Sequence, residues 1–110
     1  MKLPGGDRAI IDIVKIREYC LNAEHYHGKH KARVFRSALG MTAADAEALQ
    51  AALASVALGE DAKLGASDEF GVRYIIDFEL KNATRSAMVR SVWIVLTGEE
   101  IARLVTCYVL

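Results

Sequence analysis

The sequence predicts an α+β domain, with two or three N-terminal helices packed on one face of a three- to four-stranded antiparallel sheet. Hydrophobic residues recur at helical spacing up to Gly59, whereas from Phe70 onward they recur at every second position. Helices followed by a run of antiparallel strands are typical of this class. The chain has 110 residues and is 53% hydrophobic, which is enough for one core. We therefore predict a single domain over residues 1–110, with residues 1–8 as a loose lead-in.

Three helices are predicted in the first half of the chain. The first begins at Asp12, a suitable capping residue, and ends near Leu21. The second spans residues 29–39 and ends at Gly40, because glycine readily adopts the left-handed conformation of a helix cap. The third helix begins with a capping-box pattern, Thr42 followed three residues later by an aspartate, and it ends near Gly59.

The second half of the chain predicts the strands. Residues 70–80 alternate in the way of a strand with one buried and one solvent-facing side. Residues 87–96 are apolar on both faces, which is typical of a central strand. A turn at residues 97–100 leads into the last strand, residues 101–110. Residues 62–64 are a candidate short edge strand.

One stretch, His25–Arg36, concentrates the chemically reactive side chains. It holds all three histidines of the chain, several lysines and arginines, and no acidic residue. On the predicted helix, Lys29 and Arg33 lie on one face, whereas Lys31 lies within the opposite, apolar face. Lys31 must therefore either extend past its apolar neighbours to solvent or point into a cleft beside the sheet.

Charge and composition exclude some classes of protein. The 14 basic and 14 acidic side chains give zero net charge, which argues against a protein coated in positive charge to hold nucleic acid. A local basic patch still suits an enzyme that contacts a few phosphates. No apolar run approaches the roughly 20 residues of a membrane span, and no signal peptide begins the chain, so we expect a cytoplasmic protein without membrane contact. Cys20 and Cys107 are expected to be buried apolar residues, not a disulfide.

Four short patterns resemble a known family. They are Gly28-x-x-Lys31-Ala32-x-x-Phe35, Gly71-x-x-Tyr74, Val92-Trp93-Ile94-Val95 and Leu104-Val105-Thr106-x-Tyr108. In order and spacing they are similar to a bacterial family described as a domain of unknown function, which occurs as small stand-alone proteins and at the ends of toxin-like proteins. The resemblance covers the chain from about Ile10 to its end.

A second, looser resemblance concerns activity. The helices, the sheet and the closing Leu-Val-Thr-x-Tyr pattern are similar to the ribonuclease toxin group that includes barnase, EndoU, colicin and RelE-type nucleases. In that group a proline usually follows the closing pattern, where this chain has Val109. A second proline usually follows the position of Ile101, where this chain has Ala102. The resemblance implies a metal-independent ribonuclease that acts on RNA without a cofactor.

RNA cleavage requires a base for the 2′-hydroxyl proton, cations that hold charge at the phosphorus, and an acid for the leaving oxygen. Histidine titrates near neutral pH, so His27 or His30 is a candidate base or acid. The predicted catalytic residues are His27, Lys31 and, through the resemblance, Thr106. The predicted substrate-binding residues are Lys29, Arg33 and, through the resemblance, Tyr108.

Strand parity bears on this prediction. A turn of two or four residues before the last strand would place Thr106 and Tyr108 on the face that carries Ser91 and Trp93, with Arg90 on the opposite face. Arg90 is a further cation implied by the resemblance. It would lie apart from Thr106 unless a β-bulge intervened.

Other functions compete with the ribonuclease. The spacing His25-x-His27-x-x-His30 could reach one zinc ion, but it spans a change from loop to helix, and solvent-facing histidines explain it better, so we predict no metal site. A non-catalytic protein-interaction module, such as a cognate partner in a toxin system, fits the small size and zero net charge. Trp93 and Tyr108 would then anchor the interface or, as we favour, fill the core. Cys107 would be a nucleophile only beside a histidine or a cation.

Overall fold

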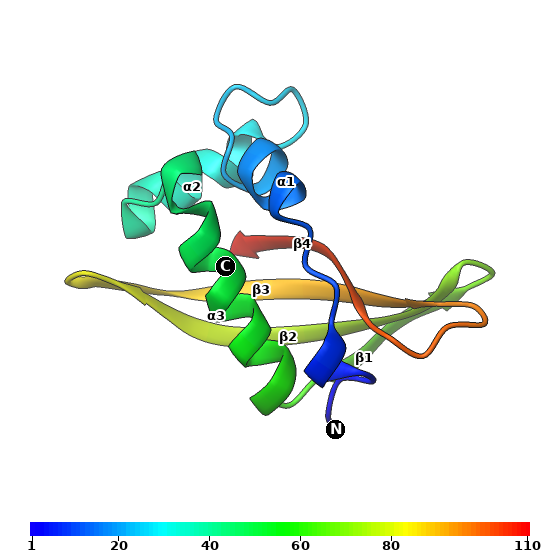
Figure 1. Ribbon diagram of the computed structural model, residues 1–110. Helices are drawn as coiled ribbons and strands as arrows, with labels where there is room; N and C mark the ends of the chain where they lie inside the picture. The colour runs from blue at the N-terminus through cyan, green and yellow to red at the C-terminus, as the bar shows by residue number, and fades with distance from the viewer.

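The sheet has four antiparallel strands in the order β1-β2-β3-β4, and its helices pack on one face and beyond the β4 edge (Figure 1). The structure is a computed structural model that describes residues 1–110. The helical elements are η1 (Gly6–Arg8), α1 (Ile13–Lys15), η2 (Ile16–Cys20), α2 (Lys29–Leu39), η3 (Ala43–Asp45) and α3 (Ala46–Gly59). The strands are β1 (Lys63–Asp68), β2 (Gly71–Asn82), β3 (Arg85–Leu96) and β4 (Arg103–Val109). The predicted α+β class is confirmed.

Capping residues set the helix boundaries. Asp12 accepts a hydrogen bond from the Val14 amide at 2.9 Å and begins α1. Gly40 closes α2 with a φ of 66°, and α2 has the predicted bounds. Thr42 and Asp45 form a complete capping box ahead of α3. Because these signals act within a few residues, they could be recognised before the tertiary structure was known.

The first predicted helix is not α-helical throughout. Only Ile13–Lys15 is α-helical, and Ile16–Cys20 forms a π-helical turn. The Leu21 amide donates to the Ile16 carbonyl at 3.0 Å and closes this turn. Ile16 and Cys20 are both fully buried, so the turn faces the core.

The first eight residues, expected to be a loose lead-in, are packed against the domain. Leu3 is 4% exposed and belongs to the core. The Ala62 amide donates to the Met1 carbonyl at 2.6 Å, and Lys2 forms a β-bridge with Asp61. Pro4 and Gly5 form a turn that leads into η1, which begins at Gly6.

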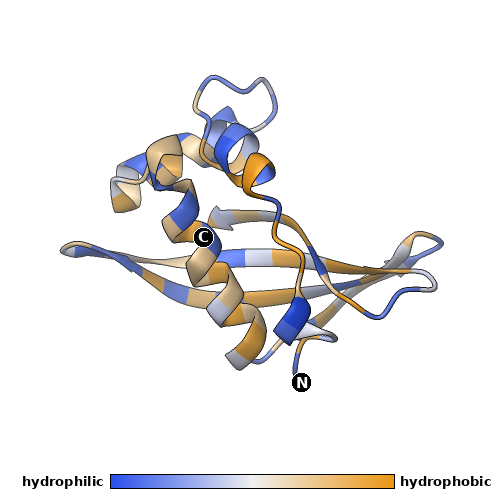
Figure 2. Cartoon of the chain, viewed as in Figure 1, coloured by the Kyte–Doolittle hydropathy of each residue, from blue (hydrophilic) through white to orange (hydrophobic).

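The core lies between the helices and one face of the sheet. Trp93 is fully buried, and its indole Nε1 donates to the Ser91 hydroxyl at 2.9 Å. That hydroxyl donates in turn to the Ile76 carbonyl at 2.8 Å. Phe35 of α2 and Leu49 of α3 are buried in the same core. Figure 2 shows the hydrophobic colouring of α3 and the hydrophilic loop between η2 and α2. Trp93 therefore fills the core, as predicted, whereas the same prediction is wrong for Tyr108, which is half-buried and lies outside the core.

A β-bulge changes the register of β4 against β3. Near the connecting loop, Trp93 pairs with Leu104. One residue farther along β3, Val92 pairs with Thr106, so Val105 is the extra residue of the bulge. All later pairs are therefore shifted by one residue.

The shift changes the face of two predicted site residues. Tyr108 pairs with Arg90, and Cys107 pairs with Ser91. Directly paired residues share a face, so Tyr108 lies with Arg90 and not with Ser91. The prediction that Thr106 and Tyr108 share the face of Ser91 is wrong, because the bulge reverses the parity that the connecting loop had established.

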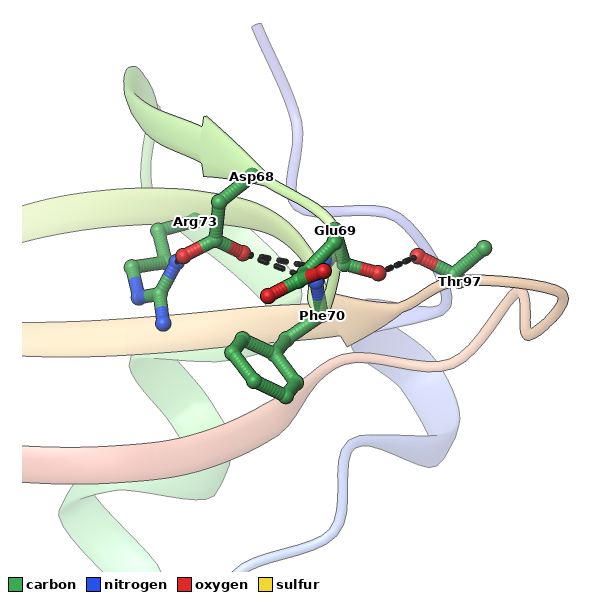
Figure 3. A network of polar contacts seen from close by, with 6 residues as sticks. Asp68, Glu69, Phe70, Arg73 and Thr97 are labelled. Atoms are coloured by element: carbon green, nitrogen blue, oxygen red, sulfur yellow. Dashed lines mark hydrogen bonds and ion pairs between the residues drawn. The ribbon is translucent and has the colours of Figure 1, made fainter.

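β1 covers only part of β2. It pairs with Gly71–Ile75, whereas β3 pairs with β2 over Gly71–Asn82. A polar network fixes the turn between β1 and β2 (Figure 3): the Asp68 carboxylate accepts from the Phe70 amide at 2.9 Å and from the Arg73 guanidinium at 2.9 Å. The far half of β2 therefore has a free edge on the side away from β3.

Candidate functional site

A cleft of about 560 Å³ lies at the outer edge of β4, where α1, η2, α2 and the loop before α2 meet that strand. Its lining residues are Asp12, Val14, Lys15, Glu18, Tyr19, His25, Lys31, Val105 and Thr106. Two of the predicted site residues, Lys31 and Thr106, line it. They come from opposite walls, one from a helix and one from the sheet.

Lys31 points into the cleft from the first turn of α2. Its side chain is half-buried, and its Nζ lies 4.9 Å from the centroid of the Tyr108 ring and 6.0 Å from that of the Tyr19 ring. No carboxylate forms an ion pair with it. Aromatic faces attract a cation without neutralising it. Lys31 therefore points into a cleft, the second of the two predicted alternatives, and its positive charge remains available to an anion.

Thr106 brings an unsatisfied hydroxyl to the same cleft. Its Oγ1 is buried and has no hydrogen-bond partner. Such a group costs about 1–3 kcal/mol of stability, so it is uncommon unless it serves a function. The hydroxyl lies close enough to the buried Cys20 thiol to lower the pKa of that group. The bulge at Val105 sets the position of this residue on the strand.

The loop between η2 and α2 places His25 at the cleft. The Nδ1 atom of His25 accepts hydrogen bonds from the amides of His27 and Gly28, both at 3.0 Å. Its ring packs edge-on against Tyr19, with 4.9 Å between the centroids. Because Nδ1 is an acceptor, neutral His25 carries its proton on Nε2. His25 therefore orders the loop, and its remaining nitrogen is a donor.

Gly28 allows α2 to begin close to η2. A Cβ at this position would overlap the carbonyl oxygen of Tyr19. Glycine avoids this overlap, and the helix can start at the next residue against the π-helical turn. This close approach explains the spacing Gly28-x-x-Lys31, since it places the third residue of α2 over the edge of the sheet.

The other predicted residues lie outside the lining. His27 is exposed on the loop, two residues from His25. Lys29 is half-buried and Arg33 is exposed on α2, and neither lines the cleft. The structure therefore brings Lys31, Thr106 and Tyr108 together, whereas Lys29 and Arg33 lie away from that group.

Tyr108 connects the cleft to an ion pair on the face of the sheet opposite the core. The Arg90 guanidinium donates to both carboxylate oxygens of Asp77, at 2.8 and 2.9 Å. This hydrogen-bonded pairing holds the pKa of Asp77 below its usual range. The same carboxylate raises the pKa of Arg90, and the Tyr108 hydroxyl adds a smaller effect. Arg90 therefore lies beside Tyr108, an arrangement that the predicted parity allowed only if a β-bulge intervened.

Cys20 and Cys107 are free, fully buried thiols on η2 and β4. The pKa of Cys20 is lowered to about 7, chiefly by a hydrogen bond with Cys107 and to a smaller extent by Thr106 and the charge of Lys31, against the effect of burial. The pKa of Cys107 is raised by Cys20 and by burial. Cys107 is therefore a poor nucleophile, because its thiol is fully buried and its pKa is raised. Cys20 is equally buried, and the two thiols do not form a disulfide, as expected from the sequence.

A family model described as a domain of unknown function, DUF6883, matches residues 2–110 of the chain. The chain belongs to the DUF6883 family. The predicted resemblance to a family of that description is confirmed. No curated protein and no solved structure matches this DUF6883 domain significantly. None of its helices is long and apolar enough to cross a membrane.

Lys15 is a cleft residue of the DUF6883 domain that sequence reasoning missed. Its Nζ donates to the Leu104 carbonyl at 3.2 Å and forms a second ammonium group at the cleft. Glu18 and Tyr19 line the same wall. In the sequence these residues look like the solvated side of a short helix, and no local signal distinguishes them. Only the contact between this helix and β4 places them at a site.

The DUF6883 cleft suits an anion better than a metal ion. No group of three or more histidine, cysteine, aspartate or glutamate side chains is placed to hold a metal, and the histidines do not converge. Of the two carboxylates in the lining, Asp12 is engaged in capping α1. Lys31 on the helix wall offers one positive charge, and Thr106 on the sheet wall offers one hydroxyl. Such a pair fits one oxygen-rich anionic group, such as a phosphodiester.

Proposed function

We propose that this DUF6883 domain is a metal-independent ribonuclease, similar in action to toxin nucleases, with its active site in the cleft beside β4. The observation that supports this function best is the meeting of the unpaired Lys31 ammonium with the unsatisfied Thr106 hydroxyl. Without a ligand both groups lower the stability of the fold, because one is a half-buried charge and the other is a buried polar group without a hydrogen bond.

The substrate phosphate binds between the helix wall and the sheet wall. Lys31 holds the negative charge of the phosphodiester, and Thr106 donates a hydrogen bond to one of its oxygens. Tyr108 keeps the lysine in place through its ring, 4.9 Å from the ammonium. Fixed donors of this kind stabilise the additional charge that forms on the phosphorus group in the transition state.

The reaction is an attack of the ribose 2′-oxygen on the neighbouring phosphorus, which breaks the bond to the 5′-oxygen and leaves a 2′,3′-cyclic phosphate. His27 removes the 2′-hydroxyl proton. We assign this role to His27, which would act on the part of the RNA that extends past the cleft lining, because the Nδ1 of His25 already accepts two amide hydrogens. Lys31 donates a proton to the departing 5′-oxygen, since an ammonium is a stronger acid than the alcohol that forms.

The decisive experiment is incubation of the protein with a mixed RNA pool in the presence of chelator. We expect cleavage that leaves 2′,3′-cyclic phosphate ends and that is absent from Lys31→Met prepared in the same way. Methionine retains the apolar stem over Tyr108 and removes the charge. An intact RNA pool over acid to mildly basic pH would contradict the proposal and leave a non-catalytic interaction module.

Substitution of the histidines tests the assignment of the base. We expect His27→Gln to abolish the rise of activity with pH in the range where imidazole titrates. His30→Gln is the matched control, because His30 is also exposed and lies at the start of α2. If His30→Gln and not His27→Gln removed the pH dependence, the base would be His30.

A further inference from the structure

The free edge of β2 presents backbone groups that no strand of this chain uses. The Leu110 amide donates to the Met88 carbonyl at 2.9 Å, so the even-numbered residues of β3 direct their backbone groups toward β4. The odd-numbered residues, such as Val89, then bond to β2. Val89 pairs with Phe78, so the even-numbered residues of β2 are the ones whose backbone groups bond to β3. The odd-numbered residues of β2 therefore direct theirs to the other side.

Beyond the reach of β1, those odd-numbered residues are Asp77, Glu79 and Lys81. β1 does not reach them, because its first pair is Lys63 with Ile75. Figure 1 shows β1 beside one half of β2 only, while the other half has no neighbour on that side. An unpaired strand edge of this kind is a template for the addition of another strand.

A groove of about 520 Å³ runs beside this edge, between β2 and α3. Its apolar lining includes Val56 of α3 and Phe78 and Leu80 of β2. Its charged lining consists of Glu60, Asp77 and Glu79, and no basic side chain lines it. The groove therefore combines free backbone groups, an apolar wall and negative charge.

We propose that the free edge of β2 binds an extended segment of a partner protein in which apolar and basic residues alternate. The segment adds a strand to the sheet and bonds to the backbone groups of Asp77 and Glu79. Side chains alternate between faces along a strand, so every second residue of the segment packs toward Phe78, Leu80 and α3. The residues between them lie beside the carboxylate of Glu79, and a basic side chain suits that position.

The charge available to a partner is that of Glu60 and Glu79, because the Asp77 carboxylate is already held by the Arg90 guanidinium. Glu79 makes only an exposed ion pair with Lys81 at 3.6 Å, so it remains available to a basic side chain. Complementary charge therefore selects a basic segment of another protein.

The probe is a fluorescent seven-residue peptide of alternating lysine and valine, titrated against the full chain and followed by anisotropy. We expect it to bind at least about tenfold more tightly than the glutamate–valine peptide of the same length. Two versions N-methylated at alternate residues, in opposite registers, test the added strand. Methylation of the amides that face β2 should abolish binding, and methylation of the outward amides should not.

Matched variants locate the site. Glu79→Lys should weaken binding of the lysine–valine peptide about tenfold or more. Glu100→Lys makes the same charge change at an exposed residue outside the groove and should leave binding unchanged. Lys31→Met should also bind normally, so failure of the ribonuclease would not affect this test.

Three outcomes would overturn the proposal. The first is no binding of the lysine–valine peptide. The second is equal loss of binding in both N-methylated registers, which would indicate charge attraction without strand addition. The third is concentration-dependent self-association that Glu79→Lys abolishes, without peptide binding, which would assign the edge to a second copy of the chain.

Discussion

The two long edges of the sheet differ in cover and in charge. Along the β4 edge, Ile10 exchanges backbone hydrogen bonds with Ala102 and Leu104, both at 2.9 Å, and the helices add Lys15 and Lys31. The far half of the β2 edge has no strand beside it, and its groove carries three carboxylates. The β4 edge therefore carries two lysines and two carboxylates, Asp12 and Glu18, whereas the charged lining of the β2 groove is entirely acidic.

This difference shows how the packing of helices against an edge strand changes what that edge can bind. At β4 the helices hold side chains in position beside the strand, which suits chemistry on a bound group. At β2 the backbone itself remains accessible, which suits recognition of another strand. Changes at the β4 edge should therefore affect catalysis, and changes at the β2 edge should affect binding of an extended segment.

The largest effect is expected from Lys31→Met, measured as kcat/KM on a short RNA. Loss of the ammonium should lower this value by about 100- to 1,000-fold, because charge stabilisation in the transition state is lost. Arg36→Met is the control, since it removes one positive charge from an exposed position of the same helix. An equal loss in both variants would mean that α2 contributes only a diffuse positive field.

Gly28→Ala should follow in size, with an effect on stability as well as activity. The new Cβ would overlap the Tyr19 carbonyl and push α2 away from η2. Overpacking of this kind costs roughly 1–3 kcal/mol, which denaturant unfolding would measure. Gly59→Ala is the control, because a Cβ there meets nothing within 4 Å. Similar losses in the two variants would contradict the close approach of α2.

Thr106→Val separates function from stability at the β4 edge. Valine has nearly the same shape but no hydroxyl, so activity should fall about tenfold through loss of one hydrogen bond to the phosphate. The free energy of unfolding should remain within about 0.5 kcal/mol or rise, because a buried unsatisfied hydroxyl is removed. A large loss of stability with unchanged activity would show that the hydroxyl is purely structural.

The smallest effect is expected from the ion pair of Asp77 and Arg90, which lies between the two edges. Because the pKa of Asp77 is lowered in the folded chain, the pair stabilises the fold above about pH 4 and this contribution is lost as the pH falls through the lowered pKa. Asp77→Asn should lower the Tm by a few degrees at pH 7. Thermal unfolding at pH 2–7 should show a shallower acid dependence in the variant than in the wild type.

Much of the fold could be predicted because its signals are local. The caps at Asp12, Gly40 and Thr42 act within a few residues, and the change of hydrophobic period marks the sheet. Lys31 could be singled out as a charge within an apolar helix face. The packed N-terminus and the cleft residue Lys15 could not be predicted, since both depend on contacts with distant segments.

The sequence by itself determined the α+β class, the ends of α2, the burial of Trp93 and the unusual position of Lys31. Tertiary structure alone decided that Val105 bulges, that Arg90 lies beside Tyr108, and that β1 stops short of Asp77. The physical reason is the period of two in a strand. A shift of one residue in register reverses every later side chain, and register depends on pairing between strands and not on the residues of one strand.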